Sequence, residues 1–579
     1  MSAERVSDAD IERLRDEATA AILGSAATKK LIVAGPGAGK TYTFQEALGA
    51  CGGKGLALTF IRNLVADLSD ALGELADVFT FHGFCKHLLH RHAVEGLREG
   101  WDYYPPLLEL IEHDLNLLGT QITRKRLEAH LHNLTEENAV AAALRLGNYY
   151  NAVSHTDLVY RVLHHLQRNT DAVPEYPLIV VDEYQDFSKL ETSFIALLSD
   201  RSPVLIAGDD DQALYSFKNA SARYIRELAH DAAYERFPLP YCSRCTSVIV
   251  EAVNDAIGEA VRNGKLAERL DKPFECYLPD KQVDSESHPR IFHANCTVER
   301  NNAKYVGRYV TTQIESISAD DIAQSRTEGY PTVLVIGPNP FLDRAYSVIR
   351  ERFPQAQLKM AVKSLIGVLD AYRRLARDAE SRLAWRILLH LDPLAGSDDL
   401  LRRVLENEAE LAAELPDEYR ERHLALAALV RRLLDAEGLT EEEQALLTEA
   451  IGLSIGEINE TLALEDEGEE GEEGAQRAPD EGKAIEPSIV CTSLVGAKGL
   501  SASYVFVVGF NNGHFPRDVR NITDEEVCCF LVALSRTRKE CHLVSCQRFG
   551  NVALQPSQFG RWIARHVDER KVNAAYFSS

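Results

Sequence analysis

Short apolar runs that end in polar residues recur through the first 240 residues of the chain. The first, at 31–33, leads into a glycine-rich turn and then into a helix-forming stretch. Similar runs occur in GLALTFIRNLVADL (55–68), LIVVDEYQD (178–186) and VLIAGDDDQ (204–212). Apolar strands that alternate with helices and carry polar residues at their carboxyl ends predict a parallel α/β sheet with a functional site along that edge.

A second set of strand-like runs lies further along, in PTVLVIGPN (331–339), SIVCTSL (488–494), YVFVVGF (504–510) and CHLVSC (541–546). Leucine, alanine and arginine recur at helical spacing over about 365–463, and another helical stretch covers roughly 87–150. We therefore predict an α/β protein with two parallel-sheet domains, each interrupted by a mainly helical insertion.

These patterns set the domain boundaries. The first α/β domain takes 1–86 and 151–235, on either side of the helical insertion at 87–150. The second α/β domain takes 236–364 and 484–579, around the helical insertion at 365–463 and an acidic linker at 464–483.

Length and composition agree with a multidomain globular protein. The chain has 579 residues, of which 45% are hydrophobic and 26% charged, so wholesale disorder is excluded. Runs of about 18 apolar residues are absent from the sequence and the amino terminus is charged, so we expect neither a transmembrane helix nor a signal peptide. A cytoplasmic location is the expectation.

The formal net charge of −25 argues against binding nucleic acid over a broad basic face. Any nucleic-acid site must therefore be a local groove. The segment 465–481 holds nine acidic residues and one arginine. We interpret it as a solvated linker, with a partner-binding or DNA-mimicking tract as the alternative.

Eleven cysteines are scattered along the chain without the paired CxxC spacing of a zinc or iron–sulfur site. They are expected to be reduced thiols. Cys242 and Cys245 form a lone CxxC, for which packing is the favoured interpretation over a metal or redox role.

The segment AGPGAGKT (34–41) fits the phosphate-loop pattern, with alanine in place of the first glycine. The loop comprises Gly35, Pro36, Gly37, Ala38 and Gly39, followed by Lys40 and Thr41. Its glycines let backbone N–H groups point at phosphate oxygens, while the lysine adds a positive charge and the threonine a hydroxyl ligand for Mg²⁺. The preceding strand and the following helix favour a nucleotide site.

The segment VVDEYQD (180–186) supplies the partner of that loop, an apolar strand that ends in two carboxylates. Asp182 is suited to hold Mg²⁺, and Glu183 to orient and deprotonate the attacking water. The alternative is a buried structural pair of acids.

The segment after the fourth apolar run resembles a motif of a known helicase family. GDDDQALYSFKNA (208–220) is similar to the third helicase motif of UvrD/Rep/PcrA-type superfamily 1A DNA helicases. The other motifs follow in order, with LTFIRN (58–63) as motif Ia, VFTFHGFC (78–85) as Ib, LPYCSRCTS (239–247) at the place of IV, 492–516 as V and 525–538 as VI. The resemblance implies two RecA-like domains, ATP and Mg²⁺ as cofactors, and 3′→5′ movement on single-stranded DNA.

The resemblance also assigns roles to residues. Gln212 would sense the γ-phosphate, Arg244 and Arg536 would act as arginine fingers, and Gly499 would belong to the nucleotide site. The matching DNA contacts are Phe60, Arg62, His82, Tyr215, Phe217 and Lys218. Aromatic rings at such positions stack on nucleic-acid bases, and each stacked base contributes about 1–3 kcal/mol of binding free energy. Core packing is the alternative for each ring taken alone.

Three adenosine contacts of the family are missing. Residues 17–30 contain no glutamine, Ser243 stands where a tyrosine stacks on adenine, and Ser501 replaces a ribose-binding glutamate. Tyr241 is the candidate for the missing ring, because residues two apart in an extended segment point the same way. Weak discrimination among nucleoside triphosphates is therefore expected.

We expect a compact form of this family, without a nuclease-type extension after motif VI. In this it is similar to the helicase subunits of Gabija-type anti-phage systems, which work beside an OLD-family nuclease. A rival to the helicase hypothesis is a DNA-sensing ATPase that regulates a partner nuclease without processive unwinding. A non-hydrolysing binding module is disfavoured by the intact phosphate-site residues.

Overall fold

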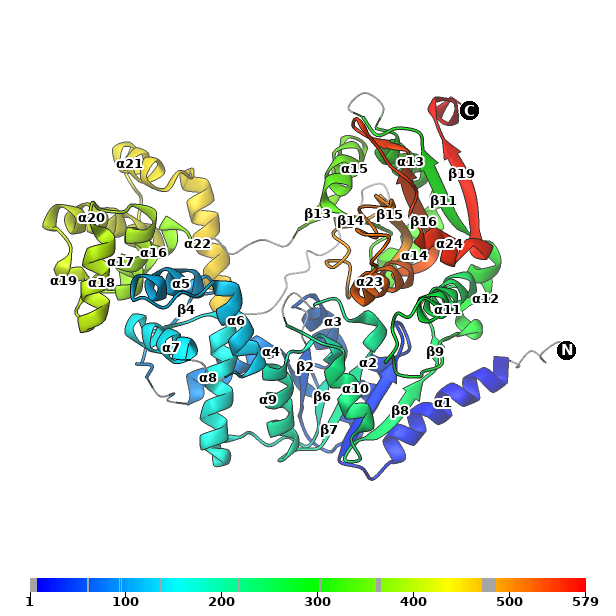
Figure 1. Ribbon diagram of the computed structural model, residues 1–579, viewed down its shortest axis with the longest axis horizontal. Coiled ribbons are helices and arrows are strands. Elements are labelled where there is room, and N and C mark those ends of the chain that lie inside the picture. Colours follow the sequence, from blue (N-terminus) through cyan, green and yellow to red (C-terminus); the bar gives the residue numbers. More distant parts are fainter. Residues whose placement is uncertain are drawn as a thin grey trace.

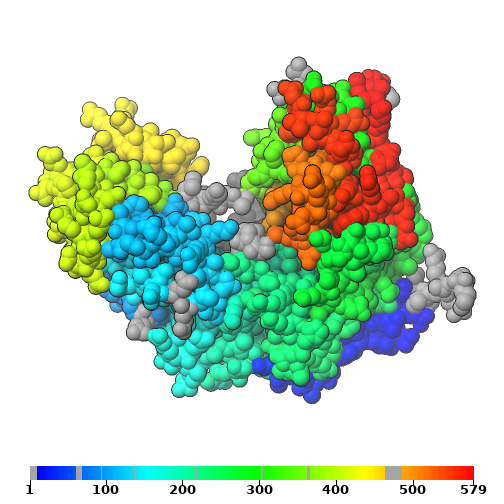
Figure 2. Space-filling model, in the orientation of Figure 1, coloured from blue at the N-terminus to red at the C-terminus, as the bar shows by residue number. Residues whose placement is uncertain are grey.

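The computed structural model describes residues 8–59, 62–92, 94, 96–135, 138–215, 219–300, 304–360, 366–470 and 486–578. Two α/β parts and one helical body make up the molecule (Figure 1). In the space-filling view the helical body and the second α/β part form two lobes with a hollow between them (Figure 2). Among the described residues, every helix is too short or too polar to cross a lipid bilayer.

The first α/β part contains a six-stranded sheet in the order β3-β2-β6-β7-β1-β8, with all strand pairs parallel. The strands are β1 (Lys29–Ala34), β2 (Gly55–Thr59), β3 (Ala76–Thr80), β6 (Ile179–Val181), β7 (Val204–Gly208) and β8 (Glu235–Leu239). The central strands β6, β7 and β1 are buried almost throughout, as their continuous apolar runs predict for a sheet covered on both faces. The three polar segments that follow these strands therefore meet at one edge.

Seven helices accompany this sheet in the described chain. They are α1 (Asp8–Gly24), α2 (Lys40–Ala50), α3 (Arg62–Leu72), α4 (Phe81–Arg91), α8 (His155–Arg168), α9 (Lys189–Ser199) and α10 (Arg223–His230). Short 3₁₀ turns, η2 (Tyr184–Asp186) and η3 (Asp210–Gln212), follow β6 and β7.

The second α/β part contains a seven-stranded parallel sheet in the order β13-β14-β12-β15-β16-β11-β19. Its strands are β11 (Ile291–Cys296), β12 (Val333–Ile336), β13 (Gln357–Lys359), β14 (Ile489–Thr492), β15 (Ala502–Val508), β16 (Thr537–Cys546) and β19 (Val567–Val572). The accompanying helices are α11 (Ser247–Arg262), α12 (Leu278–Ser287), α13 (Tyr305–Glu315), α14 (Ala319–Thr327), α15 (Asn339–Arg352), α23 (Asp524–Ser535) and α24 (Phe559–Trp562). The predicted fold class, with two parallel sheets, is confirmed.

Three two-stranded pairs complete the strands. They are β4 (Asp102–Tyr103) with β5 (Ala152–Val153), β9 (Tyr241–Cys242) with β10 (Glu275–Cys276), and β17 (Arg548–Phe549) with β18 (Val552–Ala553). The first two pairs are parallel and the third is antiparallel.

The two predicted helical insertions pack together in one hydrophobic core, on the left of Figure 1. One contributes α5 (Leu107–Leu117), α6 (Arg124–Asn133) and α7 (Asn138–Tyr150). The other contributes α16 (Val368–Arg377), α17 (Arg382–Leu391), α18 (Ser397–Asn407), α19 (Leu411–Glu414), α20 (Asp417–Leu434), α21 (Glu441–Ile451) and α22 (Ile455–Glu470). Sequence patterns gave no sign that segments so far apart share a core.

Element boundaries differ from the predicted division at three places. The division at 235/236 falls inside β8, which pairs with β1 as far as Leu239. The division at 86/87 falls inside α4. The predicted acidic linker at 464–483 begins within α22, because glutamate is a good helix former, and its residues after 470 lie outside the described part of the chain.

Candidate functional site

The phosphate loop joins β1 to α2, as predicted. Gly37 and Gly39 have φ angles of 69° and 84°, a left-handed conformation that residues with a Cβ rarely adopt. A Cβ on Gly37 would also lie 2.5 Å from the Cβ of Arg244. Glycine is therefore required here for both conformation and space, and α2 starts with free backbone N–H groups that suit an anion.

A cavity of about 260 Å³ lies against this loop and receives residues from both α/β parts. It is lined by Pro36, Gly37, Ala38, Gly39, Lys40, Thr41, Asp182, Glu183, Gln212, Ser243, Arg244, Gly499, Arg536 and Arg538. All six residues predicted to be catalytic line this one cavity, although they come from five separate segments of the chain. Gly35 lies behind it, beside Phe274.

Lys40 is held between the two carboxylates that follow β6. Its Nζ lies 3.7 Å from Asp182 Oδ1 and 3.2 Å from Glu183 Oε1. Burial raises the pKa of Asp182 to about 6, against the opposing effect of Lys40. Burial also acts to raise the pKa of Glu183, but Lys40 and Lys498 outweigh it and hold that pKa well below its usual range.

Glu183 is fixed by its backbone as well as by its partners. Its φ of 54° is in the left-handed region, a strained conformation for a residue with a side chain. Gln185 Nε2 donates to Glu183 Oε2 over 2.5 Å, and the backbone N–H of Glu183 donates to Asp182 Oδ1 over 2.9 Å. The turn η2 thus directs this carboxylate into the cavity.

Gln212 connects the two α/β parts. It donates through Nε2 to Asp209 Oδ2 over 2.6 Å and accepts at Oε1 from Arg536 Nη2 over 2.9 Å. Burial, followed by the nearby Arg244, lowers the pKa of Arg536 to about 9. The Gln212 amide, at the end of η3, is thus bonded both to Asp209 of its own part and to Arg536 of the second part.

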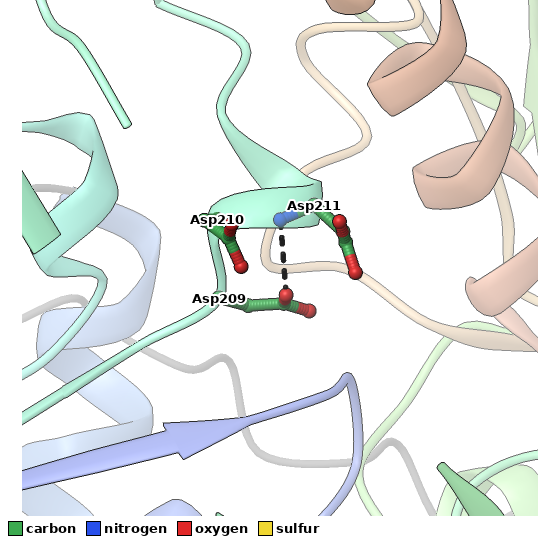
Figure 3. A group of neighbouring side chains, drawn as sticks. All are labelled: Asp209, Asp210 and Asp211. Carbon is green, nitrogen blue, oxygen red and sulfur yellow. Dashed lines mark hydrogen bonds between the residues drawn. The ribbon is translucent and has the colours of Figure 1, made fainter. Parts of the chain in front are cut away.

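Three aspartates, Asp209, Asp210 and Asp211, converge beside this site (Figure 3). Their carboxylates have the spacing of a metal site, but Lys272 Nζ lies 2.9, 2.6 and 2.7 Å from them, in that order. Arg226 and Arg269 pair with Asp210 and Asp211. The cluster therefore has cationic partners from the protein itself and anchors η3, which carries Gln212.

The predicted DNA contacts are described only in part. Phe60, Phe217 and Lys218 lie outside the described residues, and Arg62 begins α3 with a side chain that is likewise outside them. His82, on α4, stacks on His155 with ring centroids 3.5 Å apart. Tyr215 is partly buried, with Lys498 Nζ 5.7 Å from its ring centroid.

Tyr241 lies outside the phosphate cavity, in a neighbouring groove. This groove is lined by Arg15, Ala18, Thr19, Ala38, Gly39, Tyr42, Thr43, Leu239, Pro240 and Tyr241. The predicted ring is thus beside the phosphate loop and next to the amino-terminal helix, but it is only 8% exposed.

Ser243 and Ser501, which stand at positions of the family's adenosine contacts, form hydrogen bonds with other groups of the protein. Ser243 donates through both its backbone N–H and Oγ to Gly37 O, over 3.0 and 3.2 Å. Ser501 Oγ accepts from Arg538 Nε over 3.1 Å.

Sequence reasoning missed three cations of this region, which are Lys272, Lys498 and Arg538. Lys498 directly precedes Gly499 and Arg538 lies two residues after Arg536, so proximity to motif residues was a usable signal for both. Lys272 carried no such signal, because it lies in a loop between motifs.

Comparison with known proteins shows that the chain is similar to DNA helicases. Residues 108–233 match the model of the UvrD/REP helicase N-terminal domain. The chain is 24% identical to DNA helicase II of Escherichia coli strain K12, across 84% of this chain and 77% of that protein. It is 25% identical to the ATP-dependent DNA helicase UvrD1 of Mycobacterium bovis, across 89% and 80%.

A shorter match reaches the ATP-dependent DNA helicase srs2 of Schizosaccharomyces pombe, 33% identical over 34% of this chain and 22% of that protein. The matched helicase domain and the length of the first two matches both indicate similarity to DNA helicases. The cavity that residues of both α/β parts line is consistent with that similarity. Over most of its length the chain is thus similar to UvrD-type DNA helicases, and residues 108–233 match the N-terminal domain of that family.

Proposed function

We propose that this protein is an ATP-dependent DNA helicase or translocase that moves 3′→5′ on single-stranded DNA. The observation that carries the proposal is the cavity between the two α/β parts, where the phosphate loop and Glu183 face Arg244 and Arg536. A site that needs residues from both parts hydrolyses nucleotide only when the parts are close together. Hydrolysis is then linked to movement between them.

Within this site each residue has a chemical task. Lys40 and the loop N–H groups bind phosphate oxygens, and Glu183 accepts a proton from the attacking water. Arg244 and Arg536 donate to the charge that develops on the transferred phosphoryl group. Gln212, the last residue of η3, is bonded to Arg536. It therefore links these donors to the segment that begins at Tyr215.

The donors present also suit Mg²⁺. Thr41 and Asp182 line the same cavity, and hydroxyl and carboxylate oxygens are the ligands this ion prefers. When bound, the ion neutralises charge on the phosphate oxygens.

The test measures nucleotide hydrolysis and strand displacement together, on 3′-tailed, 5′-tailed and blunt duplexes. The proposal expects hydrolysis that DNA stimulates, with displacement from the 3′ tail. Displacement only from the 5′ tail would refute the polarity. DNA-stimulated hydrolysis without displacement on any substrate would favour the rival function, a DNA-sensing ATPase that regulates a partner nuclease in anti-phage defence.

A further inference from the structure

Lys498 crosses from the second α/β part into the first. It lies in the loop between β14 and β15, yet its ammonium contacts three groups of the other part. Nζ lies 2.5 Å from Asp186 Oδ2 and 3.3 Å from Glu183 Oε2, and it donates to Gln212 O over 2.7 Å. The side chain is 1% exposed, so its charge is shielded from solvent and directed at these partners.

Three acceptors use the full donor capacity of one ammonium group. The acceptors come from both polar turns at the sheet edge, since Glu183 and Asp186 belong to the segment after β6 and Gln212 to the segment after β7. Asp186 depends on this lysine, because neither of its buried oxygens has a hydrogen-bond partner among the described residues apart from this ion pair. Lys498 therefore joins both turns at a single point.

The same ammonium also lies near Tyr215, which is one of the predicted DNA contacts. Tyr215 is three residues beyond Gln212, and its ring centroid lies 5.7 Å from Lys498 Nζ, within the range of a cation–π contact. Glu183, on the opposite side, takes its other contacts from Gln185 and Lys40 of its own α/β part. Lys498 is thus the contact that reaches Glu183 from the second part and also faces Tyr215.

We propose that Lys498 is a positioning residue that orients the Glu183 carboxylate to take a proton from the attacking water, and that it couples Tyr215 to hydrolysis. The coupling to Tyr215 rests on the proposed function, in which this ring contacts single-stranded DNA. Separation of the two α/β parts withdraws Lys498 with its loop and leaves Glu183 Oε2 with Gln185 as its partner. The arginine fingers act on the nucleotide, whereas Lys498 acts on the general base.

The test compares Lys498→Met, Asp186→Asn and the double variant, with and without saturating poly-dT single strand. Lys498→Met leaves Asp186 buried without a counter-ion, which by itself disturbs the fold. The double variant removes that problem. It therefore separates a purely structural lysine, whose loss Asp186→Asn repairs, from a positioning one, whose loss it does not.

We expect the double variant to keep the melting temperature of the wild type within a few degrees. Its DNA-stimulated kcat should fall at least about tenfold with little change in KM for ATP, since small misplacements of a catalytic group are costly. Asp186→Asn alone should retain most activity, because Lys498 keeps Glu183 and Gln212. Lys498→Arg should recover part of kcat, and Lys571→Met, at an exposed lysine of β19, controls for the lost charge.

Wild-type kcat in the double variant would overturn the proposal, as would a loss confined to KM. Failure of the proposed function gives a different result, namely wild-type hydrolysis that poly-dT does not stimulate. In that case a tenfold loss of basal kcat in the double variant still supports the orientation of Glu183, and an unchanged basal kcat refutes it.

Discussion

Replacing Arg386 by methionine is expected to destabilise the helical body formed by the two insertions. Arg386, on α17, lies 2.7 Å from Asp114, on α5, with exposed fractions of 2% and 0% for the two side chains. Tyr150 donates its hydroxyl to the other Asp114 oxygen over 2.7 Å. Burial would raise the pKa of Asp114, but Arg386 outweighs it and keeps the pKa below its usual value.

The expected magnitude follows from burial of the pair. Removing one partner leaves a buried charge without compensation, which costs about 3–5 kcal/mol. Replacing both partners by uncharged groups of similar volume is far less costly. Arg386→Met should therefore destabilise the helical body much more than Asp114→Asn combined with Arg386→Met does.

Trp385 provides the assay, because it is fully buried in the same core, next to Arg386. The chain has three tryptophans, so replacing Trp101 and Trp562 by phenylalanine leaves Trp385 as the single reporter. Urea unfolding followed by its fluorescence should show the Arg386→Met midpoint lower by roughly 2 M, for a denaturant slope of about 2 kcal/mol per M. The double variant should unfold near the midpoint of the reporter protein.

Two results would refute this reasoning. A midpoint shift of less than about 0.5 M for Arg386→Met would show that the ion pair does not join the two insertions in solution. A double variant as unstable as the single one would show that lost packing, and not an unpaired charge, causes the effect.

Lys40→Ala should abolish hydrolysis, because the charge that binds phosphate is lost, and should also lower the melting temperature, because Asp182 and Glu183 lose the cation between them. Glu183→Gln should retain ATP binding, measured with a fluorescent nucleotide, but stop turnover; wild-type turnover in either variant would contradict the site. Phe217→Ala should weaken DNA-stimulated hydrolysis far more than basal hydrolysis, by about 1–3 kcal/mol of stacking, and an equal loss of both would indicate packing. GTP should support DNA-dependent hydrolysis with kcat/KM within about tenfold of ATP, since few buried groups are left to reject a wrong base. A hundredfold preference for ATP would contradict this, and Tyr241→Ala would then identify the ring.

Sequence reasoning located the strands that carry the site because their signal is local. The residues at 31–33, 179–181 and 204–208 form continuous apolar runs, and each run is followed at once by its polar motif. Parallel strands bring their carboxyl ends to one sheet edge, so the grouping of Lys40, Asp182 and Gln212 followed from strand assignment alone. The structure brings these three residues to one cavity.

Contacts between distant segments were beyond sequence reasoning. Lys498 is 286 residues from Gln212, and Arg386 is 272 residues from Asp114. Periodicity shows that a helix has an apolar face but does not identify the surface that covers it. The shared core of the insertions and the lysines at the motif turns are therefore properties of tertiary packing.

These long-range contacts share one feature, which is that cations from later in the chain contact groups of the first sheet. The cations Lys272, Lys498 and Arg536 follow β8 in the chain, whereas the groups they meet lie at the edge of the first sheet. Each cation is nearly fully buried, so separating the two parts must rehydrate it or leave an acidic partner alone. The contact between the two parts is thus stabilised by the same groups that are proposed to orient Glu183 and Gln212. Under the proposed function, bringing the parts together and assembling the hydrolytic site would be the same event, and a ligand that changes their separation would change the rate of hydrolysis.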